Sequence, residues 1–305
     1  MTPYRREADY IPPPLRRLVF HSQDEFYLSH HFDPHLVAHL MYEGFLPIAT
    51  EWQDQYFLLP KLHRSRSVLL LTPETPPHVP KSVRKRGKKY CFVLNRDVDA
   101  VIAGCHEQHG VPWLYPPMVA TFRALFHEGI HVTPEASVHL VTVEVYDVAT
   151  HALVAGELGY TVGTSYTSLT GFTRAKGAGT VQLHALGCFL ARAGCTMWDL
   201  GMAMEYKTRL GAQNLDRDAF LALLYKGRTQ TTPFALTEKS KATTSAREVD
   251  MAIRDLFTYE RRTQQTRNES KEHGGHGDTP RQDAGQGHDT QADETKADHS
   301  STDAR

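Results

Sequence analysis

Two carboxylates occupy strand positions where an apolar residue would be expected. Glu157 lies inside the apolar pattern of residues 152–160, and Asp199 follows the apolar run that begins at Cys195. An acid in a central strand costs free energy unless it is paired or has a function. Glu157 is therefore a candidate proton acceptor unless its strand lies at an edge or on the surface. Asp199 is a candidate base or an anchor for a substrate amine, or else a capping or paired structural carboxylate.

A glycine-rich loop with two cations joins a predicted strand to a predicted helix. Residues 174–179 follow the pattern R-x-x-G-x-G, in which the cations are Arg174 and Lys176 and the glycines are Gly177 and Gly179. Glycines let backbone N–H groups approach an anion, and a helix N-terminus supplies positive potential. The loop is thus either an anion site or a plain tight turn.

A basic stretch precedes the first strand of this region. Residues 81–89 hold six basic residues in nine, which favours contact with phosphates, a solvated charge run or a nuclear-import signal. The candidate nucleic-acid contacts are Arg84, Lys85, Arg86, Lys88 and Lys89. Trp113, in a proline-rich loop between two predicted helices, would either stack on a base or pack in the core.

Two further candidates follow the last core strand. Glu205 is of a type that could take a proton from an acceptor amine, and Tyr206 is of a type that could protonate a leaving group. Each of them also has an ordinary surface role available.

Hydrophobic periodicity predicts the elements that would position these residues. The predicted helices are residues 34–43, 98–109, 119–128, 180–193 and 218–225, and the predicted strands are 68–71, 90–94, 138–147, 152–160, 165–172 and 195–200. A tight turn between the fourth and fifth of these strands predicts a hairpin in which Glu157 lies opposite Ser168. The order predicts an α+β fold with a mixed sheet flanked by helices, which is also the element order of the GCN5-related N-acyltransferase fold.

Composition divides the chain into four parts. We expect a small N-terminal subdomain over residues 1–80, an acyltransferase-like domain over 81–230, a linker with a short helix over 231–260, and a disordered tail over 261–305. The tail has no hydrophobic residue larger than alanine, so it cannot offset its ordering entropy. Its four histidines are expected in a solvated tail rather than a metal site.

Charge and cysteine content exclude several protein classes. The net charge is −1, so nothing global favours nucleic acid or a membrane, and any anion-binding surface must be local. The four cysteines form no C-x-x-C pair, and no apolar run has the length of a membrane span. These features predict a cytoplasmic protein without membrane contact or a metal, and we expect a monomer.

Short collinear motifs, from Asp33 to Arg217, resemble those of the leucyl/phenylalanyl-tRNA–protein transferases. They are Asp33–Pro34, Gly44–Phe45–Leu46–Pro47, Val101–Ile102–Ala103–Gly104–Cys105, Trp113, Phe126–His127–Glu128–Gly129, Val143–Glu144–Val145–Tyr146, Leu153–Val154–Ala155–Gly156, and Leu210–Gly211–Ala212 with Arg217. Two family motifs associated with catalysis differ here. The resemblance places Leu169 at the position of the family Glu and Gly201 at that of the family Gln, while the Asp is kept as Asp199. The chain resembles a divergent, eukaryote-type branch.

The resemblance implies transfer of a Leu- or Phe-like amino acid from tRNA to a protein N-terminus, in an N-degron pathway and without a cofactor. Aminoacyl-tRNA and acceptor N-termini would be the partners. The implied substrate-binding residues are Trp113, Ser168, Leu169, Phe172, Tyr206 and the loop Arg174, Lys176, Gly177 and Gly179. Glu157 or Glu205 would replace the missing Glu.

Two other functions remain open. The loop of residues 174–179 resembles the pyrophosphate loop of acetyl-CoA-dependent enzymes of the same fold, which favours an acyl-CoA-dependent N-acyltransferase with acetyl-CoA as cofactor. The changed catalytic positions favour a catalytically inactive homologue that binds tRNA or degrons.

Overall fold

A mixed nine-stranded sheet forms the centre of the computed structural model, which describes residues 24–111, 113–231 and 249–273. In sheet order its strands are β10 (Gln213–Asp216), β3 (Ser65–Leu70), β9 (Met197–Asp199), β8 (Ser165–Thr173), β7 (Leu153–Val162), β6 (Ala136–Asp147), β4 (Tyr90–Leu94) and β11 (Val249–Ala252), and β5 (Ile130–Thr133) pairs with β6. Neighbouring strands are antiparallel, with the exception of β8 and β9, which are parallel. The predicted mixed sheet is confirmed.

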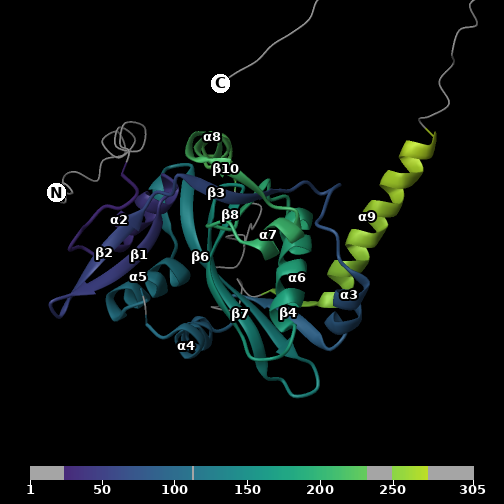
Figure 1. Ribbon diagram of the computed structural model, residues 1–305, viewed down its shortest axis with the longest axis horizontal. Helices are drawn as coiled ribbons and strands as arrows, with labels where there is room; N and C mark the ends of the chain where they lie inside the picture. Colours follow the sequence, from purple (N-terminus) through teal and green to yellow (C-terminus); the bar gives the residue numbers. More distant parts are fainter. Residues whose placement is uncertain (1–23, 112, 232–248, 274–305) are drawn as a thin grey trace, which may run out of the picture.

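Helices cover both faces of this sheet (Figure 1). One layer contains α2 (Pro34–Tyr42), α4 (Val98–His109), α5 (Pro116–His127) and α8 (Arg217–Gly227), with the two-stranded sheet of β1 (Leu46–Trp52) and β2 (Gln55–Lys61) beside them. The other layer contains α3 (Lys81–Gly87), α6 (Ala178–Ala193) and α9 (Ile253–His273). Each layer closes its own apolar core against the sheet, so the predicted α+β architecture is confirmed.

The helix boundaries follow from local chemistry. Asp33 accepts a hydrogen bond from the backbone N–H of Leu36 at 3.1 Å and so caps α2. The helix α6 starts after Gly177 at φ +77° and stops at Gly194 at φ +89°. Both glycines occupy the left-handed region, which disfavours residues with a side chain. The predicted helices over 34–43, 98–109 and 180–193 therefore agree with the structure to within two residues.

The β7–β8 hairpin is present, but its predicted register is wrong. Val162 pairs with Ser165, and the pairing shifts between Leu158 and Gly159, so that Glu157 lies opposite Gly171 rather than Ser168. The cause is a turn at Gly163 and Thr164, one residue further along the chain than predicted, combined with a β-bulge. A bulge inserts one unpaired residue and re-aims the side chains that follow it. Here the unpaired residue is Leu169.

Three features of the fold were not predicted. The β1–β2 hairpin turns at Gln53 and Asp54, both at positive φ. Strand β3 joins the main sheet although it lies within residues 1–80, and β11 joins it although it lies within the predicted linker. The predicted disorder from residue 261 is wrong as far as His273, because α9 continues to that residue. Its polar residues are mostly good helix formers, and residues 274–305 lie outside the described part of the chain.

The C-terminal helix α9 is fixed to the body by a buried ion pair. Glu260 is fully buried and pairs with the guanidinium of Arg84 from α3, while Arg84 also donates to the carbonyl oxygen of Phe257 at 2.6 Å. Within the described residues, no helix combines the length and the apolar character that spanning a membrane requires.

Glu260→Ala should lower the free energy of unfolding by about 3–5 kcal/mol, because it leaves the Arg84 charge half-buried without its partner. Urea denaturation measures the change. The matched control is Glu205→Ala, which removes the exposed partner of Arg209 on α7 (Glu205–Leu210) and should change stability little. Equal losses in the two variants would contradict a structural role for the buried pair.

Candidate functional site

The two parallel strands of the sheet separate at the point where the candidate acids lie. β8 and β9 pair over three positions, and the last pair is Thr167 with Asp199. Beyond this pair β8 continues to Thr173. Strand β9 ends at Asp199, and the residues after it leave the sheet as a loop that leads to α7. The residues that follow this last pair therefore face a split in the sheet, where backbone pairing no longer fills the space.

Glu157 lies beside this split at the centre of a buried hydrogen-bond network. Its Oε1 accepts from the hydroxyls of Ser168 at 2.6 Å and Tyr166 at 2.9 Å, and its Oε2 accepts from the side-chain amide of Gln182 at 3.1 Å. The indole N–H of Trp198 donates to Ser168 Oγ at 2.9 Å. The network thus joins β7, β8, β9 and α6 around one carboxylate.

Burial raises the pKa of Glu157 to about 7, and the hydrogen bonds from Ser168 and Tyr166 and the charge of Lys207 oppose that rise. Water would solvate an ionised carboxylate better than this site does. The consequence is an acid that changes charge near neutral pH. Such a group is suited to accepting and returning a proton.

Asp199 occupies a different electrostatic environment. It is fully buried and forms an ion pair with Arg66 of β3, which is also buried. Asp199 also accepts from the Thr167 hydroxyl at 3.2 Å and from the backbone N–H of Gly201 at 2.9 Å. These partners occupy both carboxylate oxygens, so the geometry favours the paired structural carboxylate among the predicted roles. A direct role in catalysis stays a prediction.

A buried lysine donates hydrogen bonds to the backbone of the loop that follows Asp199. Lys207 is buried, and its ammonium donates to the carbonyl oxygens of Leu200 and of Met202, the latter at 2.8 Å. Burial lowers the pKa of Lys207, while the Asp199 and Glu157 carboxylates act in the opposite direction. Met202 and Met204 of this loop are exposed to solvent, and so is Tyr206 at the start of α7.

The structure separates the two candidates on α7. Burial raises the pKa of Tyr206, and the charge of Glu157 adds to this rise. Tyr206 is therefore near the Glu157 network. Glu205 is exposed and pairs with Arg209 one helical turn away, at 2.6 Å. Of the three predicted catalytic carboxylates, Glu157 and Asp199 thus adjoin the split, whereas Glu205 faces solvent.

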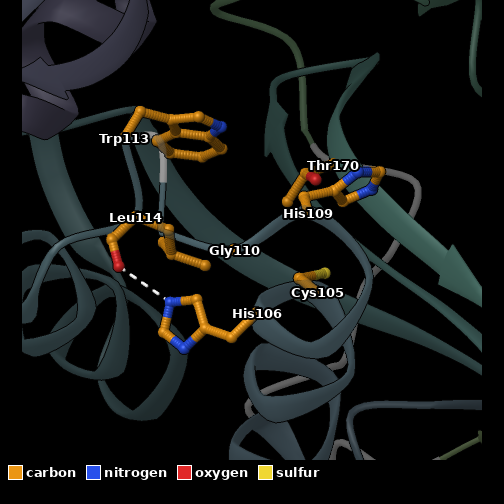
Figure 2. A pocket seen from close by; sticks show the side chains of 7 residues that line it. All are labelled: Cys105, His106, His109, Gly110, Trp113, Leu114 and Thr170. Atoms are coloured by element: carbon orange, nitrogen blue, oxygen red, sulfur yellow. Dashed lines mark hydrogen bonds between the residues drawn. The ribbon is translucent and has the colours of Figure 1, made fainter.

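A cavity of about 300 Å³ opens next to the bulge in β8. It is lined by Cys105, His106, His109, Gly110, Trp113, Leu114 and Thr170. Figure 2 shows Trp113 on one side of the cavity, with His109 and Thr170 on the other. Trp113 also meets Phe122 edge to face, with ring centroids 6.1 Å apart. The indole therefore packs on the core, as one of the two predicted alternatives has it, and also forms a cavity wall, while its stacking on a base stays a prediction.

Two histidines of the cavity wall contact backbone carbonyl groups. His106 Nε2 lies 2.8 Å from the carbonyl oxygen of Leu114, and His109 Nε2 lies 2.8 Å from that of Gly171. Because a carbonyl oxygen only accepts, each Nε2 must carry the hydrogen. Burial raises the pKa of the Cys105 thiol to about 12, so this cysteine is not a ready nucleophile.

The glycine-rich loop joins the end of β8 to the start of α6. Thr173 Oγ1 accepts from the N–H of Gly179 at 3.3 Å, and Arg174 pairs with Glu107 at 2.6 Å while lying over the ring of Phe172. These contacts are those of a tight turn. Lys176 is exposed, so the cationic part of the predicted anion site remains available.

The basic stretch has two faces. Residues 81–87 form the short helix α3, and Lys81, Lys85, Lys88 and Lys89 of the stretch are exposed. Arg84 and Arg86 face inward. Arg84 pairs with Glu260, and the guanidinium of Arg86 lies so close to Gly177 that a methyl group there would stand 2.4 Å from it. The structure thus brings the basic stretch onto the glycine-rich loop, which the sequence did not predict.

Several site residues were not predicted. They are Arg66, Tyr166, Gln182, Trp198, Lys207, His106 and His109. For Arg66 and Gln182 a signal existed, because each is a polar residue at a core position of a periodic element. Among the described residues, no group of three His, Cys, Asp or Glu side chains is placed to hold a metal ion.

Comparison with known proteins relates the stretch that carries this site to one enzyme family. A family model described as leucyl/phenylalanyl-tRNA protein transferase matches residues 70–225. Three proteins that carry that name are similar to this chain. The one from Paracoccus denitrificans is 27% identical over 143 residues, which cover 46% of this chain and 61% of that protein, less than two thirds of its length.

The other two matches are longer. The protein from Dinoroseobacter shibae is 26% identical over 199 residues, covering 63% of this chain and 81% of that protein. The protein from Pseudomonas paraeruginosa is 27% identical over 233 residues, covering 75% and 96%. The split, the Glu157 network and the cavity all lie within the residues that the family model matches, whereas β11 and α9 lie outside them.

The raised pKa of Glu157 predicts a pH-dependent stability. The folded pKa of about 7 exceeds the ordinary 4.5, so the folded state binds more protons between these values. The free energy of unfolding should therefore fall as the pH rises through this window, by up to about 3 kcal/mol. Glu157→Gln removes the effect, so the variant should gain stability relative to the unmodified chain between pH 5 and pH 8. Urea titrations across this pH range measure the free energy of unfolding of both proteins. A difference between them that does not change with pH would refute the raised pKa of Glu157.

Proposed function

Because this chain belongs to the leucyl/phenylalanyl-tRNA protein transferase family, we propose that it transfers an amino acid from an aminoacyl-tRNA to the amino terminus of a protein. The acceptor nitrogen attacks the ester carbonyl carbon, a peptide C–N bond forms, and the ester C–O bond breaks. The tRNA leaves through the ribose oxygen of its 3′-terminal adenosine, which takes up the proton that the amine gives up. The ester is already activated, so no cofactor is required, and positioning supplies much of the rate.

The observation that carries this mechanism is the hydroxyl relay from Ser168 to Glu157. Ser168 Oγ donates to Glu157 and accepts from Trp198. A hydroxyl oxygen has two acceptor positions, so one remains for the hydrogen of an incoming amine. The amine proton then moves to Ser168 while the Ser168 proton moves to Glu157. With a pKa of about 7, Glu157 accepts this proton and returns it near neutral pH.

This arrangement supports the substitution of Glu157 for the family Glu that the resemblance places at Leu169. Leu169 is the bulged residue of β8, and Glu157 belongs to the adjacent strand β7. Gly201, at the position of the family Gln, is at φ +74° and donates its N–H to Asp199. Asp199 then acts as a positioning residue that fixes the end of β9.

The cavity beside Trp113 supports a place for the end of the tRNA. It shares Thr170 with β8, two residues from Ser168, and an indole wall is suited to stacking on a base. Ser168, Leu169, Phe172 and Tyr206 then surround the aminoacyl group, which we propose is Leu- or Phe-like. The product, a protein with a new first residue, fits an N-degron pathway.

The direct test is a transfer assay with the purified full chain. Radiolabelled aminoacyl-tRNAs are paired with peptides that begin with Arg, Lys, Asp or Glu, and a parallel arm contains acetyl-CoA. Label transferred from tRNA is the expected result. Label from acetyl-CoA alone would replace the proposal with an acyl-CoA-dependent N-acyltransferase that uses residues 174–179. Silence in both arms, from folded protein, would indicate an inactive binding homologue.

Glu157→Gln should lower kcat by about 100-fold, because general-base catalysis contributes on this scale. The KM for aminoacyl-tRNA should change little. In the unmodified chain kcat should rise with pH through about 7 as Glu157 ionises, and the variant should lose that limb. Glu205→Gln is the matched control, since Glu205 is exposed and paired with Arg209. A pH profile that survives in Glu157→Gln would exclude Glu157 as the base.

Trp113→Ala should raise the KM for aminoacyl-tRNA by about 5- to 150-fold, which corresponds to the loss of 1–3 kcal/mol of stacking on a base. Trp113→Phe should recover most of the loss, because a smaller ring still stacks. Steady-state kinetics at varied tRNA concentration measures both. A lower kcat with an unchanged KM would assign Trp113 to the chemical step instead.

A further inference from the structure

The C-terminal unit of β11 and α9 lies outside the residues that the family model matches, yet it is built into the fold. β11 pairs antiparallel with β4 at the edge of the sheet. α9 packs against α6 and α3 with its first turns and then projects from the body (Figure 1). About 20 Å of helix, from Glu260 to His273, extends past the ion pair to Arg84. Residues 261–270 of this helix are mostly exposed, so they contribute little to core packing. This part of α9 is therefore free to have another role.

The inner half of α9 determines which side of α3 faces solvent. Gly87 of α3 packs so tightly on α9 that a methyl group there would stand 2.7 Å from the Phe257 ring and 2.9 Å from Ile253. Together with the Arg84–Glu260 pair, this contact fixes the rotation of α3. The four lysines Lys81, Lys85, Lys88 and Lys89 consequently point outward.

The part of α9 that directly follows Glu260 carries the same charge as the exposed side of α3. Arg261, Arg262 and Arg267 are exposed, and no acidic residue occurs among residues 261–267. Arg86 and Lys176 lie at the glycine-rich loop next to α3. Since the whole chain has a net charge of −1, this concentration of cations is local and not a consequence of a basic protein.

We propose that α3 and residues 261–267 of α9 form one binding surface for the phosphate backbone of tRNA. The proposal rests on the proposed function, which supplies tRNA as the substrate. Long cationic side chains spaced along a helix suit phosphates, whose contacts are electrostatic and independent of sequence. A membrane surface is a poorer match, because a helix that binds in the interface needs a large apolar face, and residues 261–273 hold no large apolar side chain.

The test measures binding of deacylated tRNA to the full chain as a function of salt. The variant Arg261→Gln/Arg262→Gln/Arg267→Gln should bind at least about 10-fold more weakly at low salt. The slope of log K against log salt should be smaller by about two to three, since each lost phosphate contact removes just under one unit. In the transfer assay the KM for tRNA should rise, while kcat at saturating tRNA stays the same.

The matched control removes the same charge from the other helical layer. Arg64→Gln/Arg123→Gln/Lys226→Gln replaces three exposed cations and should leave the slope nearly unchanged. Lys85→Gln/Lys88→Gln should reduce the salt slope as the α9 variant does. If α3 and α9 act as one surface, the slope of the combined variant should be smaller by the sum of the two reductions.

The outcomes separate the two proposals. If the unmodified chain binds and uses tRNA but the α9 variant matches the control, the surface is wrong and the proposed function stands. If the unmodified chain does not bind tRNA, and label moves from acetyl-CoA alone, both are overturned. Equal losses of tRNA affinity in the α9 variant and the control would indicate a general charge effect. They would also overturn the proposal that α3 and α9 form the binding surface.

Discussion

The buried ion pair between Arg66 and Asp199 is the constraint on which the rest of the site depends. Arg66 comes from β3 and Asp199 from the end of β9, so the pair joins two neighbouring strands where one of them stops. Arg66 also donates to the carbonyl oxygen of Gly44 and lies over the ring of Phe220. The pair therefore also ties the start of β1 and the helix α8 to this strand end. A buried guanidinium is tolerated only with such full pairing.

Fixing the end of β9 in this way leaves β8 without a partner on its β9 side from Ser168 onward, while its other side stays paired with β7. On this length of β8 the Ser168 hydroxyl donates to Glu157, and the bulge at Leu169 precedes Thr170, which lines the cavity. The two buried acids thus differ in their partners. Asp199 faces a permanent cation, whereas Glu157 faces hydroxyls and an amide and has a pKa near 7. The environment, not the residue type, separates a positioning carboxylate from one that exchanges protons.

The sequence predicted the helices and the hairpin well, because caps, glycines and periodicity are local. It missed the Glu157 register, since a bulge depends on cross-strand packing that no single strand encodes. The Arg66–Asp199 pair joins residues far apart in the chain, and the sequence indicated only that Asp199 was out of place. The basic stretch was found as a charge run, but its division into inward arginines and outward lysines depends on Glu260 in α9, a helix whose outer half the composition assigned to disorder.

The helix α6 connects the electrostatic surface to the chemistry. Its first turn begins at Gly177, against which the guanidinium of Arg86 from α3 lies. Five residues later, about 7.5 Å along the axis, Gln182 donates to Glu157. Any shift of α3 or of the loop at the start of α6 must move either Arg86 or the backbone that carries Gln182, because a close-packed interior transmits displacement. The orientation of the proton-accepting carboxylate and the placement of the basic helix are therefore set by the same helix, and neither can be adjusted without the other.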